Sequence, residues 1–197
     1  MRRNREGNKK KKIIGYIAIF LMFGSVFGFI FLGFRTGGQF LDTVEYNDFE
    51  FASRGTHWST TIDGTDAPFS YLPADVELLL IQDNAINRLK GVIEIDATYD
   101  FNDTFAESIA LAQFQMGTTL FNFNIFVRNG FTSQYQNFPV ITCKDATRFV
   151  PVIYFKESNV TNAHMENNCI IAEAANAADV IRLKDRLVYG ILGIIKT

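Results

Sequence analysis

The chain has 197 residues, of which 48% are hydrophobic and 14% aromatic, and its formal net charge at neutral pH is −2. The charge is divided unevenly, because residues 1–12 carry seven cations and one anion whereas residues 35–197 carry 12 cations and 20 anions. Between them, residues 13–34 contain no charged side chain. This division excludes an ordinary soluble domain. The apolar content and the two cysteines exclude a disordered chain and a disulfide-dense miniprotein.

The uncharged run 13–34 predicts a transmembrane helix. At about 1.5 Å per residue its length is roughly 33 Å, which matches the hydrocarbon core of a bilayer. We interpret it as an uncleaved signal anchor; the alternative, a cleaved secretory signal, usually has a shorter apolar region. The basic residues 1–12 predict a cytoplasmic tail. The expected localisation is therefore the cell membrane, single-pass, with residues 35–197 outside.

The predicted partners follow from this topology. The basic tail would contact anionic lipid headgroups of the bilayer, and the exterior part would contact another membrane or surface protein. Gly24 and Gly28 form a small-xxx-small pair that would allow a homodimer, although glycine is common in membrane helices in any case. Because the apolar run already explains the cations, we expect no nucleic-acid partner.

The expected fold class is one N-terminal transmembrane helix plus an α/β (mixed α+β) exterior domain with a β-rich N-terminal part. Residues 35–44 have the composition of a linker, and residues 45–197 are predicted to form the exterior domain. Alternating apolar residues in segment 46–72 predict a small antiparallel meander with a two-residue turn at Asp63-Gly64.

A second unit is predicted to follow the meander. Residues 92–98 have the composition of a strand, and Thr104 with Glu107 forms a capping-box pattern that opens a helix. Alternation over 121–128 predicts a strand that ends at Asn129-Gly130, and strand, helix and strand in succession favour a crossover onto one sheet. The remaining expected elements are short helices from Pro73 and at 84–90, strands at 138–143, 150–157, 161–166 and 169–174, and a closing helix capped by Asn176.

The two cysteines lie beside predicted strands. Their even number and the absence of a Cys-x-x-Cys motif favour a structural disulfide between Cys143 and Cys169. The alternative is a Cys143 nucleophile with His57 or His164 as base, which no local signature supports. The spacings used by common zinc modules do not occur, so we predict no metal site and no cofactor.

Carboxylates gather at the end of the strand predicted at 92–98. Asp96 and Asp100 follow the spacing of the ligands in an EF-hand loop, together with Thr98, Asn102 and Glu107. However, Phe101 occupies the position at which that loop needs glycine. A helix cap and a strand end explain the same residues. Since ligands of α/β folds bind at the carboxyl ends of strands, Asp96, Asp100 and Asp103 are nevertheless the candidate ligand-binding residues.

Two sequons, Asn102-Asp103-Thr104 and Asn159-Val160-Thr161, are candidate glycosylation sites. We predict no catalytic residue, because Walker, dinucleotide-binding, Gly-x-Ser-x-Gly and His-Glu-x-x-His motifs are all missing from the sequence.

Two resemblances add to these expectations. The run Val150–Lys156, with Pro151 at its start and a hairpin and terminal helix after it, is similar to the C-terminal half of thioredoxin-like folds. That family's redox pair is missing, which implies a non-redox relative. The segments Ala146-Thr147, Pro151–Lys156, Glu166–Ile170 and Asp185–Ile194 look like uncharacterised single-pass membrane proteins of archaea of the small-genome (DPANN) type. That resemblance implies a surface module without a known activity.

The leading functional hypothesis is a membrane-anchored extracytoplasmic binding or assembly module without catalysis. The alternative is an extracytoplasmic enzyme, either a hydrolase or a thioredoxin-like relative without the redox pair, with a site near Asp96, Asp100 and Cys143. A third hypothesis is a metal- or glycan-binding module.

Overall fold

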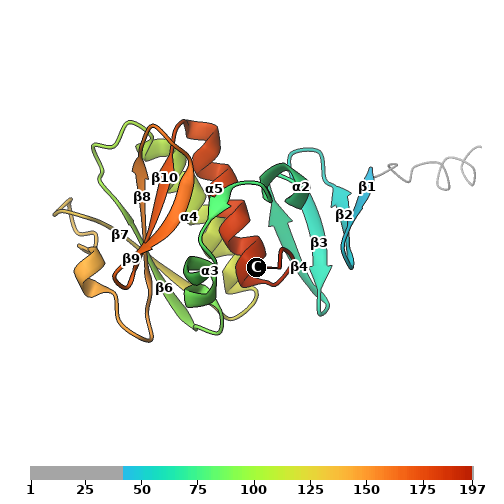
Figure 1. The fold of residues 1–197 in the computed structure, drawn as a ribbon, viewed down its shortest axis with the longest axis horizontal. Helices are drawn as coiled ribbons and strands as arrows, with labels where there is room; N and C mark the ends of the chain where they lie inside the picture. The colour runs from blue at the N-terminus through green and yellow to red at the C-terminus, as the bar shows by residue number, and fades with distance from the viewer. Residues whose placement is uncertain (1–41, 197) are drawn as a thin grey trace, which may run out of the picture. The chain divides into compact units, whose positions relative to one another are not determined.

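A computed structural model of the protein describes residues 42–196 (Figure 1). The predicted tail, residues 1–12, and the predicted transmembrane segment, residues 13–34, lie outside the described residues. The described part is a mixed α+β domain built on two sheets.

The first sheet is the antiparallel meander that the sequence predicts. Its strands β1 (Thr43–Tyr46), β2 (Phe49–Ser53), β3 (Trp58–Ile62) and β4 (Thr65–Phe69) pair in sequence order. Asp63 and Gly64 have φ angles of 49° and 81°, which is the conformation that a two-residue turn of type I′ requires. The β-rich N-terminal part is therefore confirmed.

The second sheet has six strands in the order β5-β9-β10-β8-β6-β7. Strands β10, β8, β6 and β7 are mutually parallel, and β9 is antiparallel to β10. The helix α4 connects β6 to its parallel neighbour β7, as the predicted crossover requires. The bounds are β5 (Leu80–Ile81), β6 (Glu94–Tyr99), β7 (Phe126–Phe131), β8 (Val152–Glu157), β9 (Asn162–Glu166) and β10 (Cys169–Ala174).

The helices pack into one apolar core on one face of the six-stranded sheet. They are α2 (Pro73–Val76), α3 (Asp83–Leu89), α4 (Ala106–Phe121) and α5 (Ala177–Ile191). Ile95 of β6, Met116 of α4 and Leu187 of α5 belong to this core and are fully buried. Figure 1 shows α4 and α5 between the six-stranded sheet and the meander, and the rings of Phe69 and Tyr189 stack 4.0 Å apart where the meander meets α5.

A long loop, 132–150, covers the opposite face of the six-stranded sheet (Figure 1). It contains the short 3-10 turn η1 (Cys143–Asp145) and contributes Ile141 to a second apolar cluster with Val152, Cys169 and Ile171. Gly130 permits the close approach of this loop, because a Cβ there would lie 2.6 Å from the Pro139 carbonyl oxygen.

Three local predictions are wrong. The strand expected at 138–143 is the loop, with a single bridge between Val140 and Phe131 before η1. The strand expected from residue 121 begins at Phe126, because α4 continues to Phe121, so Asn129 and Gly130 lie inside β7. The predicted capping box at Thr104 does not form, because α4 has Phe105 at its N-cap and no side-chain cap; Asp103 Oδ1 instead accepts the Phe105 amide at 2.8 Å.

The length and apolarity of the described helices also correct two predictions. Within residues 42–196 no helix combines the length and apolarity needed to cross a bilayer, since α4, the longest, has 16 residues and a length of about 24 Å. This finding contradicts the predicted fold class with its transmembrane helix and the predicted single-pass localisation. The predicted span itself, 13–34, lies outside the described residues.

Candidate functional site

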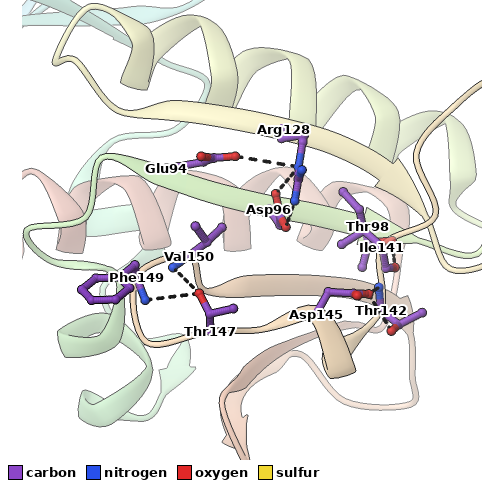
Figure 2. Close-up of polar contacts among 10 residues, drawn as sticks. All are labelled: Glu94, Asp96, Thr98, Arg128, Ile141, Thr142, Asp145, Thr147, Phe149 and Val150. Carbon is purple, nitrogen blue, oxygen red and sulfur yellow. Dashed lines mark hydrogen bonds and ion pairs between the residues drawn. The ribbon is translucent and has the colours of Figure 1, made fainter.

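The first predicted ligand residue, the buried Asp96, forms an ion pair with the half-exposed Arg128 on the neighbouring strand (Figure 2). Arg128 Nε donates to Oδ1 at 2.7 Å and a terminal guanidinium nitrogen donates to Oδ2 at 2.6 Å. The Asp96 side chain is 1% exposed, whereas that of Arg128 is 48% exposed and also lies 3.8 Å from Glu94. The hydrogen bonds to Asp96 raise the pKa of Arg128 above its ordinary value. The Asp96 carboxylate is thus occupied within the chain.

The other two candidate carboxylates are also engaged by the backbone. Asp100 Oδ1 accepts the amide of Asn102 at 2.9 Å, which forms a local turn. The second oxygen of Asp103, beyond the one bonded to Phe105, accepts the amide of Glu157 at 2.9 Å and ties the start of α4 to the end of β8. Among the described residues no group of three or more His, Cys, Asp or Glu side chains is placed to hold a metal ion.

The predicted disulfide between Cys143 and Cys169 is confirmed, with Cα atoms 5.1 Å apart. Cys169 pairs with Val152 of β8, which in turn pairs with Asp96, so the disulfide and Asp96 lie on the same face of the sheet. A bonded Cys143 has no thiolate to act as a nucleophile. The enzyme hypothesis therefore finds neither a free thiol nor a free carboxylate at Asp96.

Hydrogen bonds to the sheet and within the loop stabilise loop 132–150 in the same region (Figure 2). The buried hydroxyl of Thr98 donates to the Ile141 carbonyl at 2.8 Å. Asp145 accepts both the amide and the hydroxyl of Thr142, and these bonds hold the pKa of Asp145 below its ordinary value. The Thr147 hydroxyl accepts the amide of Val150 at 3.0 Å. The disulfide and the Thr98–Ile141 hydrogen bond thus form a structural clamp between the loop and the sheet, and the bonds of Asp145 and Thr147 order the loop internally.

The histidines and sequons are separate from this clamp. His57 precedes β3 of the meander and His164 lies on β9, where its Nδ1 is 2.9 Å from the side-chain oxygen of Asn162. Asn102 and Asn159 are both exposed in turns. Glycosylation at these two positions stays a prediction.

A different site lies between α4 and the edge strand β7. A groove of about 380 Å³ lies where the two elements pack together, and three phenylalanines on its walls are largely exposed: Phe114 is 67% exposed, Phe121 69% and Phe126 55%. We call it the α4–β7 groove. Its lining contains no charged residue and consists of Gln113, Phe114, Gly117, Thr118, Phe121, Asn122, Phe126, Val127 and Asn129.

One polar group in this groove has no protein partner. Gln113 is 3% exposed, and its side-chain nitrogen Nε2 is buried without a hydrogen bond among the described residues. A buried amide without a partner costs about 1–3 kcal/mol, so such groups are rare in folded proteins. Gln113 thus lines the groove with a side chain whose Nε2 has no partner in the described part of the chain.

Strand β7 forms the outer edge of the six-stranded sheet. It pairs with β6 on one side. On the other side the loop reaches only its end, where Phe131 donates its amide to the Pro139 carbonyl and accepts the amide of Ile141. No strand of the described part pairs with the outer side of Phe126–Gly130. The groove thus runs beside an open strand edge.

Sequence reasoning missed this groove, although a signal was present. The core face of α4, formed by Ile109, Ala112, Met116 and Leu120, is fully buried. Phe114 and Phe121 do not belong to that face and are seven positions apart, which places them on one side of the helix. Two aromatic residues outside the core face of a helix indicate a contact surface.

Comparison with known proteins adds no relative. No family model matches the chain, and no curated protein or solved structure matches it. The archaeal and thioredoxin-like resemblances therefore stay predictions.

Proposed function

We propose that the protein is a binding module that takes an extended segment of a partner protein into the α4–β7 groove. The observation that carries this proposal is the gathering of Phe114, Phe121 and Phe126, each more than half exposed, around one groove. Exposed aromatic side chains are enriched at protein interfaces, where their burial supplies most of the binding energy.

The open edge of β7 supports an extended partner. Outward amide and carbonyl groups of an edge strand can pair with an added strand, and the groove beside it then receives alternate side chains of the partner. The chain itself uses this edge at Phe131, where the segment Pro139–Ile141 lies parallel to it. A partner segment beside Phe126–Asn129 would extend the same pairing.

The groove lining supports a partner segment of apolar and uncharged residues. A charged side chain would lose its water among the phenylalanines without gaining an opposite charge, since the lining carries none. The unpaired Nε2 of Gln113 would donate to a carbonyl oxygen of the bound segment.

The test begins with a phage-displayed library of short random peptides, from which those that bind the immobilised protein are selected. The affinity of each selected peptide is then measured by calorimetric titration. Phe121→Ser should weaken binding by about tenfold or more, because it removes an aromatic wall of the groove. Phe149→Ser is the matched control, since Phe149 is 77% exposed on loop 132–150 and outside the groove.

Peptides N-methylated at alternate positions test the strand pairing. One register of methylation should abolish binding and the other should preserve it, because alternate amides face the edge of β7. Equal affinity of the Phe121→Ser and Phe149→Ser variants would refute the groove as the site. Self-association of the protein through β7, detected by ultracentrifugation and lost in Phe126→Ser, would replace the partner with a second copy of the chain.

A further inference from the structure

Helix α5 carries three consecutive charged residues that are all buried. Lys184 is 2% exposed, Asp185 is 0% exposed and Arg186 is 6% exposed. Lysine side chains usually extend to water, because burying an ammonium group without compensation is costly. Each N–H donor of the buried Lys184 ammonium group therefore needs a hydrogen-bond acceptor.

Asp185 is completely satisfied in this arrangement. Its Oδ2 accepts the amides of Ser70 and Tyr71, each at 2.9 Å, and its Oδ1 accepts Lys184 Nζ. Burial raises the pKa of Asp185, and Lys184 and the two amides oppose that rise. The carboxylate thus joins the end of β4 to α5.

Lys184 is not satisfied to the same degree. An ammonium group has three N–H donors, and in the described part of the chain Nζ bonds to Asp185 Oδ1. Lys184 also lines a cavity of about 300 Å³ between the meander, α4 and α5. The remaining donors of Nζ are therefore available to a molecule in this cavity, which we call the Lys184 cavity.

The walls of the Lys184 cavity combine apolar and polar side chains. Pro68, Phe69 and Phe114 supply apolar surface. The polar lining consists, besides Lys184, of Thr56, His57, Ser70, Gln115, Thr118 and Thr119. The Ser70 hydroxyl and the Gln115 oxygen are 3.4 Å apart, a weak bond that a ligand could replace. A mostly apolar pocket with a few convergent polar groups is typical of a small-molecule site.

We propose that the Lys184 cavity binds a small molecule with a flat apolar body and an uncharged carbonyl oxygen that accepts from Lys184 Nζ. The neutral net charge of the Lys184–Asp185 ion pair favours a ligand with a carbonyl group over a ligand with a carboxylate. Asp185 already neutralises Lys184, so a ligand carboxylate would meet a second buried carboxylate beside the same ammonium group. This site is distinct from the α4–β7 groove, although Phe114 and Thr118 line both.

Three probes of nearly equal shape test the proposal by NMR titration of the isotope-labelled protein. They are acetophenone, α-methylstyrene, in which a methylene replaces the carbonyl oxygen, and benzoate. Acetophenone should shift the amide signals of Ser70 and Gln115 and the Nζ signal of Lys184, and it should bind at least about fivefold more tightly than either of the others.

Variants identify the site without breaking the ion pair. Lys184→Met leaves Asp185 without its cation and can fail to fold, so the decisive variant is Gln115→Trp, which fills the cavity and should abolish acetophenone binding. Ala110→Trp is the matched control, because Ala110 is exposed on α4 and outside the cavity lining. Equal affinity for acetophenone and α-methylstyrene, no shift with any probe, or unchanged binding in Gln115→Trp would overturn the proposal.

Discussion

The two faces of the six-stranded sheet are covered by different means. On one face, α3, α4 and α5 contribute to a continuous apolar core together with alternate residues of the strands. On the other face, loop 132–150 contributes a single fully buried side chain, Ile141, to a cluster with Val152, Cys169 and Ile171. The first face is stabilised by apolar area, and the second by bonds to a few residues of the loop.

This difference explains how the loop is held on the sheet. A loop without regular backbone pairing and with little apolar area needs other attachments. The disulfide, the Thr98–Ile141 hydrogen bond and a hydrogen bond from Arg88 of α3 to the Thr147 carbonyl supply them. Polar groups on this face are therefore used for folding, and the recognition surface that we propose lies at the edge of the sheet, beside β7.

The largest expected effect is on the helix-covered face. Phe155 of β8 is 1% exposed in the apolar core, and Phe155→Ala should lower the free energy of unfolding by about 3–5 kcal/mol. Urea denaturation followed by circular dichroism measures it. Phe149→Ala, at a residue 77% exposed on the loop, should change stability by no more than about 0.5 kcal/mol. Similar losses for both variants would contradict the assignment of the core.

The next effect concerns the disulfide on the loop-covered face. Cys143 and Cys169 are 26 positions apart, so the double variant Cys143→Ala/Cys169→Ala should lose about 2–4 kcal/mol in the chain-entropy account. Hydrogen exchange should accelerate most in segment 138–150 and least in α4 and α5. Uniform acceleration across both faces would show that the loop is not a separate unit of stability.

A smaller effect is expected for the ion pair between Asp96 and Arg128. Arg128→Met leaves the buried Asp96 carboxylate unpaired, which should cost about 1–3 kcal/mol in unfolding experiments. The double variant Asp96→Asn/Arg128→Met should recover part of that loss, because the neutral amide needs no cation. A double variant as unstable as the sum of both single variants would mean that the two residues act independently.

Local patterns predicted most elements of this fold. The turn at Asp63-Gly64 and the cap at Asn176 depend on neighbouring residues alone, and both formed where expected. The failures lie where tertiary contacts override local pattern. Alternation from Phe121 suggested a strand, yet α4 continues to Phe121 and β7 begins only at Phe126. Ahead of α4, Asp103 rather than Thr104 accepts a backbone amide, that of Phe105, and its other oxygen bonds to β8.

The candidate site could not be predicted in the same way. Asp96 and Arg128 are 32 positions apart in sequence and become partners only through the register of β6 against β7. Gln113 appears in the sequence as one polar residue of a helix, and its missing hydrogen bond depends on what surrounds it. By contrast, the cysteine pairing follows from a count of two and was predicted correctly.

The smallest expected effect concerns Glu173, on the sheet face that the loop covers only in part. Although burial alone would raise its pKa, hydrogen bonds from Lys156 and Asn162 lower the pKa of Glu173 below its ordinary value. A carboxylate with a lowered pKa stabilises the fold above its ordinary pKa, and this stabilisation is lost as the pH falls through the folded-state value.

Glu173→Gln should therefore cost at most about 1 kcal/mol near neutral pH, because partly exposed ion pairs contribute little. The difference from the parent protein should shrink when urea denaturation is repeated between about pH 5 and about pH 3, where the parent loses its charge and the glutamine has none to lose. Glu166→Gln, at the exposed end of β9, serves as the control for a change of one surface charge. A constant difference across this range would mean that Glu173 contributes to stability through packing and not through its charge. The disulfide and the Asp96–Arg128 pair would then be the interactions that distinguish this face from the helix-covered face.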